Sequence, residues 1–180
     1  QGDYTIPNGI KQIAGYAFWE CSSLNSVTIP ESVVKIGNNA FESSVVLINL
    51  DFGSNSSLEE LGERAFYLCE GLVEITLPKT LKLIGYESFG LCRNLTTIKF
   101  EEESSLVEIS DLSFYGCSKL KEIDIPLSTK KIGKAFYYVT TSFTIYYQGS
   151  QSDWNNIIIV RGNSSQYDYW LTNAKIIYKK

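Results

Sequence analysis

Carboxylates and thiols are the side chains of this sequence best suited to chemistry, because histidine is absent from all 180 residues. Without histidine there is no Ser-His-Asp triad and no Cys-His nucleophile pair. A zinc site would have to be built from cysteines and carboxylates alone. Most common hydrolase mechanisms are therefore excluded.

The carboxylates Asp51, Glu74, Glu122 and Asp124 stand in short segments where apolar and polar residues alternate, as in half-buried strands. General acid–base catalysis needs a pocket that shifts pKa, and an open strand face implies no cleft. We expect no enzyme activity, no catalytic residues and no cofactor. Three glutamates at 101–103 offer carboxylate ligands for calcium, but a solvated charged turn is the simpler interpretation, and we predict no metal site.

Four cysteines each stand three residues after a phenylalanine: Cys21, Cys69, Cys92 and Cys117. Four cysteines are compatible with a disulfide framework in a secreted domain. Equivalent positions of stacked coils, however, lie about 4.8 Å apart with parallel Cβ atoms, which is poor disulfide geometry. We predict free thiols packed as a ladder of small buried hydrophobes. Ser44 and Val139 occupy the same position in the other units.

The cysteine spacing is part of a longer repeat that must position all of these side chains. Its phenylalanines recur at separations of 23, 25, 23, 25 and 22 residues, at Phe18, Phe41, Phe66, Phe89, Phe114 and Phe136. A leucine follows each of the first five by six residues, at Leu24, Leu47, Leu72, Leu95 and Leu120. A period between 20 and 50 residues indicates a solenoid whose stacked coils bury one continuous core.

Within one unit, Leu24, Val27 and Ile29 are expected to point inward while Ser26 and Thr28 point outward. The shorter units turn through a proline, whereas the longer ones insert polar segments at 53–57 and 101–105, which we expect to form loops. Glycines recur one residue after an inward aliphatic residue, where we expect a positive φ or a close backbone approach. They are Gly37, Gly62, Gly85 and Gly133.

The repeat dissolves from about Tyr137, and aromatic residues become frequent. We expect a strand at 143–147, a helical turn at 153–155 with a Ser or Asp cap, an apolar segment at 157–160 and a final strand at 174–178. Terminal repeats of a solenoid are atypical because the last coil must close against water. We therefore predict about six coils over residues 1–147 and a capping segment of the same domain over 148–180.

The units SLNSVTIPESVVKIGNNAFESS and GLVEITLPKTLKLIGYESFGLC resemble the BspA-like leucine-rich repeat family, whose repeat runs close to L-x-x-I-x-I-P-x-x-V-x-x-I-G-x-x-A-F-x-x-C. The resemblance covers residues 4 to about 147, and the tail is similar to a segment that often closes bacterial arrays. It implies a right-handed, mostly β solenoid with a parallel sheet on one face. It also implies a bacterial protein that is secreted or at the cell surface, with adhesion as the expected role.

The strand pattern predicts one polar, mostly acidic face that an extended partner would contact, although an ordinary solvated strand face is the simpler interpretation. Its outward residues are Ser26, Thr28, Asn49, Asp51, Glu74, Thr76, Thr97, Lys99, Glu122, Asp124, Thr144 and Tyr146. A protein or a cell-surface glycan is the expected ligand.

A second candidate surface is an aromatic stripe formed by the residue after each repeat phenylalanine: Trp19, Tyr67, Tyr115 and Tyr137, with Glu42 and Gly90 at the other positions. Exposed aromatics are enriched at interfaces, but they also cover the edges of neighbouring coils. Further aromatics form either the core of the cap or a contact surface: Tyr137, Tyr138, Tyr146, Tyr147, Trp154, Tyr167, Tyr169 and Trp170.

Composition excludes two classes of partner. The net charge is −4 and the basic residues are scattered. The chain therefore lacks the cluster of Lys and Arg that binding to nucleic acid or anionic lipid requires. The longest apolar run is four residues, far short of a membrane span of roughly twenty. The missing initial methionine indicates a processed or truncated chain, so the lack of a visible signal peptide says nothing about secretion.

These observations favour a monomeric, non-catalytic extracellular binding module. The alternatives are a structural spacer and an accessory carbohydrate-binding repeat domain of a larger surface protein. The solenoid is a scaffold, and a scaffold does not by itself determine a ligand.

Overall fold

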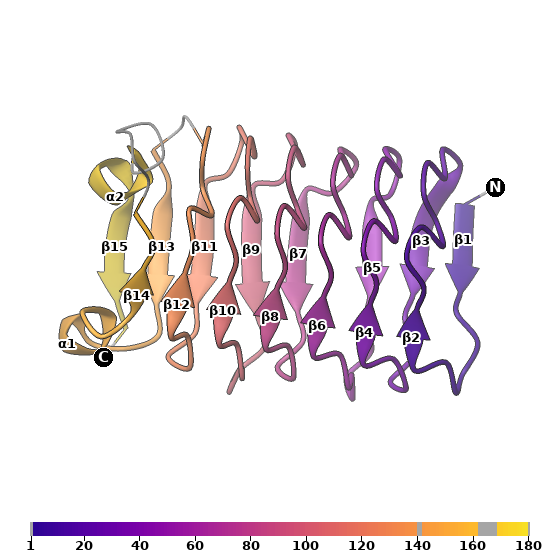
Figure 1. Cartoon of the computed structure of the whole chain (residues 1–180), viewed down its shortest axis with the longest axis horizontal. Helices are drawn as coiled ribbons and strands as arrows, with labels where there is room; N and C mark the ends of the chain where they lie inside the picture. The colour runs from indigo at the N-terminus through magenta and orange to yellow at the C-terminus, as the bar shows by residue number, and fades with distance from the viewer. Residues whose placement is uncertain (1, 140–141, 162–168, 180) are drawn as a thin grey trace.

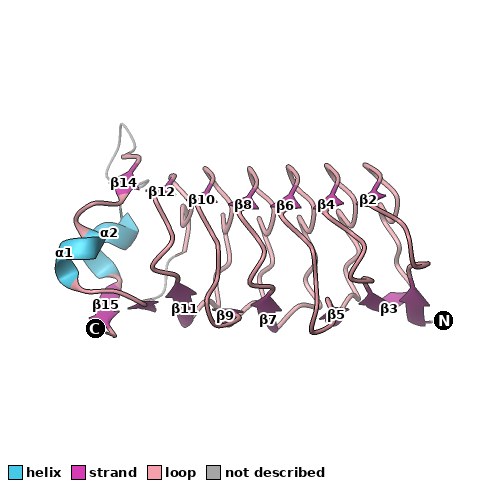
Figure 2. Ribbon diagram, turned by 90° about the horizontal axis from the view of Figure 1, so that it is seen from below, coloured by secondary structure: helices cyan, strands magenta, loops and turns pink. Residues whose placement is uncertain are grey.

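The chain winds into a solenoid of parallel strands, with its two ends at opposite ends of the long axis (Figure 1). The computed structural model describes residues 2–139, 142–161 and 169–179. Each coil places one longer strand on one side and one two-residue strand on another, and Figure 2 shows these two sides facing each other. In the part of the chain that the structure describes, helix is confined to two short segments at the C-terminal end.

The longer strands form the long-strand face, in two parallel sheets ordered β1-β3-β5 and β7-β9-β11-β13-β15. They are β1 (Gly2–Thr5), β3 (Leu24–Thr28), β5 (Asn49–Asp51), β7 (Glu74–Leu77), β9 (Thr97–Phe100), β11 (Glu122–Ile125), β13 (Thr144–Tyr147) and β15 (Lys175–Tyr178). The face divides between β5 and β7, where the chain carries the longer polar segment at 53–57.

The two-residue strands form the short-strand face, a seven-stranded parallel sheet. They are β2 (Gln12–Ile13), β4 (Lys35–Ile36), β6 (Glu60–Leu61), β8 (Leu83–Ile84), β10 (Glu108–Ile109), β12 (Lys131–Ile132) and β14 (Ile158–Ile159). Ion pairs cross neighbouring coils here, as between Lys35 and Glu60 at 2.7 Å and between Lys131 and Glu108 at 2.9 Å.

A third side, the turn side, is built around the repeat phenylalanines, and its described residues form no regular strand. Backbone N–H groups of one coil donate to carbonyls of the next, as from Phe18 to Ala40 at 2.7 Å and from Phe41 to Ala65 at 2.8 Å. The residues two before and two after most of these phenylalanines have positive φ. They are Tyr16, Glu20, Asn39, Ser43, Arg64, Leu68, Glu87, Leu91, Leu112, Gly116 and Tyr138.

The repeat phenylalanines form a stacked column along the solenoid axis. Successive ring centroids from Phe18 to Phe136 lie 4.8 to 5.7 Å apart, with interplanar angles of 0° to 16°. The rings from Phe41 to Phe136 are buried, while Phe18 in the first coil is partly exposed. Stacking of this kind adds about 0.5–1.5 kcal/mol per pair to the burial of apolar surface.

The recurring glycines owe their place to close backbone approach and not to positive φ. None of Gly37, Gly62, Gly85 and Gly133 has a positive φ. A Cβ at Gly85 would lie 2.5 Å from the Leu61 carbonyl oxygen, and one at Gly37 would lie 2.7 Å from the Gly15 nitrogen. The first of the two expected explanations is therefore wrong, and the second is confirmed.

All four cysteines are free thiols, as predicted, and Cys69, Cys92 and Cys117 are fully buried. Their role goes beyond packing, because each of these three thiols donates to the carbonyl of the phenylalanine in the preceding coil. Cys92 Sγ lies 3.1 Å from the Phe66 oxygen. Ser44, in the same repeat position, donates its hydroxyl to the Phe18 carbonyl at 2.8 Å. In these four units the position thus combines a small side chain with a hydrogen-bond donor.

The C-terminal segment continues both sheets. Helix α1 (Gln151–Trp154) begins at the N-cap Ser150, whose side chain forms a capping box with Asp153. Strand β14 then pairs with β12, and β15 pairs with β13 after helix α2 (Tyr169–Asn173). The expected strands and helical turn are confirmed within one or two residues, whereas the division at residue 148 stays a prediction.

Of the predicted cap aromatics that the structure describes, three are buried: Tyr147, Trp154 and Trp170. Trp170 packs 5.1 Å from the ring of Phe136, the last member of the phenylalanine column. Tyr138 is half-exposed. Tyr167 and the side chain of Tyr169 lie outside the described residues. No helix in the described ranges has the length and apolar character that a membrane span needs.

Candidate functional site

Strand register places the twelve predicted outward residues in two columns on the long-strand face. Glu74 lies beside Thr97, and Glu122 lies beside both Thr97 and Thr144. The second column pairs Thr76 with Lys99 and Asp124 with Tyr146. The break between β5 and β7 separates these from the N-terminal group, in which the pairs are Ser26 with Asn49 and Thr28 with Asp51.

Thr97 is the exception among these residues, because it is only 7% exposed. Its hydroxyl lies 3.5 Å from both Glu122 Oε1 and the Thr96 hydroxyl, so neighbouring side chains cover it. The expectation that Thr97 is free to meet a partner is therefore wrong. The other eleven side chains are exposed or partly exposed, so the predicted surface otherwise exists as a polar face.

The C-terminal half of this face is hollowed. A cavity of about 500 Å³, which we call the acidic groove, is lined by residues 100–104, Asp124, Pro126, Leu127, Gln148 and Lys179. A smaller hollow of about 170 Å³, the sheet hollow, is lined by residues 97–99, Glu122, Asp124, Tyr146 and Lys179. Asp124 and Lys179 line both and so mark the boundary between them.

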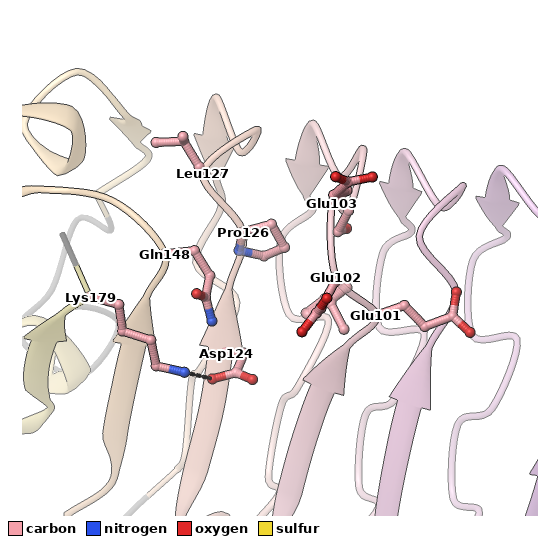
Figure 3. Close-up of a pocket in the computed structure, with 10 residues that line it drawn as sticks. Glu101, Glu102, Glu103, Asp124, Pro126, Leu127, Gln148 and Lys179 are labelled. Atoms are coloured by element: carbon pink, nitrogen blue, oxygen red, sulfur yellow. Dashed lines mark hydrogen bonds and ion pairs between the residues drawn. The ribbon is translucent and has the colours of Figure 1, made fainter.

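Lys179 reaches back over the long-strand face from just beyond β15, and Figure 3 shows it pointing toward Asp124. Its Nζ lies 3.4 Å from Asp124 Oδ1 and 5.1 Å from the centroid of the Tyr146 ring. The ammonium group is thus held between a carboxylate and an aromatic ring, the two groups that attract a cation most strongly at a protein surface. The Lys179 side chain remains 42% exposed.

The loop after β9 forms the other wall of the acidic groove and carries the glutamates at 101–103 (Figure 3). Glu101 Oε2 accepts the backbone N–H of Lys79 at 2.9 Å, and Ser105 N–H donates to the Lys79 carbonyl at 2.7 Å. These bonds tie the loop to the preceding coil. In the described part of the chain, no three metal-ligating side chains come together in a cluster that could hold a metal ion.

The aromatic stripe does not form one continuous surface. Trp19 is 49% exposed and contacts the edge of Tyr16. Two coils on, the ring of Tyr67 lies over the position of Gly90, where an added Cβ would be 2.8 Å from it. Tyr115 and Tyr137 stack on each other with centroids 5.8 Å apart. The stripe is therefore three separate local contacts.

A partly buried ion pair that the sequence did not reveal lies beside Tyr67. Arg64 Nε donates to Glu87 Oε2 at 2.6 Å, and Glu87 is only 7% exposed. This hydrogen bond raises the pKa of Arg64, while burial followed by the Glu87 charge raises the pKa of Tyr67. Arg64 also lies 4.8 Å from the Tyr67 ring centroid. The cluster joins two coils and leaves Tyr67 partly covered.

The buried thiols are poor nucleophiles. Burial raises the pKa of Cys117 to about 12 and raises the pKa of Cys69 and Cys92 as well. A thiol must ionise to react, so these three cysteines serve the core and not chemistry.

The sequence pattern did not predict the acidic groove, because Lys179 and Asp124 are 55 residues apart. The glutamates at 101–103 were its one local signal.

Residues 2–103 and 51–158 match the family model described as "BspA type Leucine rich repeat region", with six copies. No curated protein matches the chain. Among solved structures, a T. pallidum leucine-rich repeat protein is 25% identical with a TM-score of 0.70, covering 90% of this chain and 69% of its own.

Two further solved structures are those of a cell surface protein and of a vaccine antigen. A leucine-rich cell surface protein of Faecalibacterium prausnitzii is 32% identical with a TM-score of 0.58, covering 89% of this chain. The pneumococcal vaccine antigen PcpA is 26% identical with a TM-score of 0.70, covering 84% of this chain. This chain spans only 35% and 41% of those two proteins.

Proposed function

Because the chain belongs to the BspA-type leucine-rich repeat family, we propose that it is a non-catalytic binding module acting outside the cell. Its long-strand face contacts a host protein or matrix component in adhesion. Similarity to a cell surface protein and to a vaccine antigen supports the location. The two matches extend well beyond this chain, so the module serves a larger surface protein in this proposal.

One observation carries the proposal: the long-strand face is polar, mostly acidic and hollowed, while apolar side chains fill the interior behind it. Its carboxylates Glu74, Glu122 and Asp124 project from β7 and β11. Parallel pairing fixes the backbone of β7 on one side, against β9, and that of β11 on both sides, against β9 and β13. A rigid strand face loses little conformational entropy on binding, which favours recognition over a broad surface.

Binding to a panel of purified extracellular-matrix proteins and mucins, measured by biolayer interferometry, tests the proposal. The variant Glu74→Gln, Glu122→Gln, Asp124→Asn removes three negative charges from the face. We expect its affinity for any bound partner to fall at least about tenfold, because rigid charged contacts at an interface each contribute on the order of 1 kcal/mol or more.

The matched control removes three exposed carboxylates from other parts of the surface: Glu20→Gln, Glu31→Gln, Glu63→Gln. It changes the net charge equally, so it should bind like the original protein. If both triple variants lose affinity to the same extent, net charge and not the long-strand face governs binding, and the proposal is wrong.

Within the described residues, the aromatic stripe does not form one coplanar platform, because Tyr67 is partly covered by Arg64 and Tyr115 stacks on Tyr137. A flat aromatic surface is what a carbohydrate-binding module would present to a sugar ring. This arrangement weighs against the carbohydrate alternative and in favour of protein recognition.

A further inference from the structure

The boundary between the acidic groove and the sheet hollow already holds one ammonium group, that of Lys179. It lies 3.4 Å from Asp124 Oδ1 and 5.1 Å from the Tyr146 ring centroid. Three elements build this arrangement: β11 supplies Asp124, β13 supplies Tyr146, and Lys179 follows β15. The structure thus displays directly how this face accommodates a primary ammonium group.

The surrounding charge is unbalanced in favour of a cation. Among the described residues, two ammonium groups line the groove and the hollow, Lys99 and Lys179. Five carboxylates line them: Glu101, Glu102, Glu103, Glu122 and Asp124. Glu102 and Glu103 are exposed and form no ion pair within the described ranges. The internal lysine therefore leaves most of the negative charge of this surface uncompensated.

We propose that the acidic groove and sheet hollow bind the lysine side chains of an extended basic segment of a partner protein, and that Lys179 occupies the central ammonium position until that segment displaces it. The proposal rests on the proposed function, because it names the chemistry of the partner at the same face. An extended segment places alternate side chains on one side, about 7 Å apart, so two lysines can reach the groove and the hollow together.

Displacement of Lys179 is easy in this geometry. The pair it forms is exposed, with side-chain exposures of 42% for Lys179 and 21% for Asp124. Exposed ion pairs change an equilibrium only about two- to fivefold. An incoming lysine regains the contacts with Asp124 and Tyr146, while a second lysine adds an interaction with the glutamates at 102–103.

Titration with the peptide Ser-Lys-Ser-Lys-Ser, acetylated and amidated at its ends, tests the proposal at low ionic strength, where charge interactions are least screened. Chemical shifts of the backbone amides of Asp124, Tyr146 and Lys179 report the dissociation constant. We expect Lys179→Ala to tighten binding about two- to fivefold by removing the internal competitor. We expect Asp124→Asn to weaken it at least about fivefold, and the Nε-acetyl-lysine peptide to leave the shifts unchanged.

Lys175→Ala is the matched control. Lys175 is exposed on β15, forms no ion pair among the described residues and lines neither the groove nor the hollow. Its removal makes the same change in net charge as Lys179→Ala. If the two variants tighten peptide binding equally, the effect is only long-range electrostatics and the proposal is overturned.

The ε-methylene protons of Lys179 provide a direct reading of displacement. Because the Lys179 ammonium lies over the Tyr146 ring, these protons should resonate upfield of other lysines, and saturating peptide should return them to the ordinary position. An unchanged Lys179 signal at saturation would overturn the proposal. Failure of this proposal can be distinguished from failure of the proposed function. In that case the lysine peptide does not bind, while binding of the matrix partner still depends on Glu74, Glu122 and Asp124.

Discussion

Raising the pH from 7 to 10 should destabilise this protein through its three buried thiols. Cys69, Cys92 and Cys117 are fully buried, and burial raises the pKa of each. In the unfolded chain these thiols ionise at about pH 8.5. The folded protein therefore retains protons that the unfolded chain releases, so the free energy of unfolding falls as pH rises above about 8.5.

The size of the effect follows from this difference in proton binding. With an unfolded pKa of about 8.5–9, each thiol contributes a loss of about 1.5–2 kcal/mol at pH 10. The three together amount to about 5 kcal/mol, which is comparable with the whole stability of many domains of this size. Below about pH 8 the thiols are neutral in both states, and their contribution does not vary with pH.

Urea denaturation followed by tryptophan fluorescence at intervals from pH 7 to pH 10 measures the effect. The reference is the variant Cys69→Ser, Cys92→Ser, Cys117→Ser, because serine does not ionise in this range and Ser44 already donates to a phenylalanine carbonyl from the same repeat position. The original protein should lose about 5 kcal/mol more than the serine variant across this range. Parallel stability curves would refute the assignment to the thiols.

Two further substitutions test the packing of the solenoid, each by urea denaturation at pH 7. Phe66→Ala should cost about 3–5 kcal/mol, because it removes a buried ring stacked at 5.1 and 5.3 Å on its neighbours. Phe66→Leu also removes the ring but retains most of the volume, so it should cost less than half as much; equal losses would contradict the assignment of most of the cost to the cavity. Gly85→Ala should cost about 3 kcal/mol, because its Cβ would meet the Leu61 carbonyl oxygen at 2.5 Å. A neutral result would show that neighbouring coils separate freely.

The repeat made the core predictable, since Phe66, Cys69, Leu72 and Ile75 are all buried as their register requires. The period-two pattern likewise placed Glu74 on the outer face. These features were accessible because each depends only on spacing and hydrophobicity, and six copies repeat the same signal.

The backbone of the turn side was not predictable in the same way. Positive φ occurs at Tyr16, Asn39, Arg64 and Glu87, which share a position in the repeat but no chemical character. The hydrogen bonds between coils impose the conformation on whichever residue is present. Glycine is the usual signal for positive φ. In this repeat the recurring glycines stand at a neighbouring position, where the close approach of two backbones leaves no room for a Cβ.

The hydrogen bond donated by the buried thiols could have been predicted from the sequence, but not from hydrophobicity alone. Ser44 occupies the cysteine position in the second repeat, and serine shares with cysteine a donor group but little apolar character. The acidic groove had no comparable signal. Asp124, Tyr146 and Lys179 come together only because β11, β13 and β15 lie side by side in register, and the repeat pattern has already ended before Lys179.

The one-way hydrogen bonds of the turn side give this side of the solenoid an electrical polarity. From Tyr16 to Gly116, the N–H groups at every second residue around the repeat phenylalanines donate toward the following coil. Aligned peptide dipoles add, as they do along an α-helix. Partial negative charge therefore accumulates at the carbonyl end, in the first coil, and partial positive charge at the opposite end. Coils consequently join in one orientation only, because two carbonyl ends brought together would present acceptors without donors.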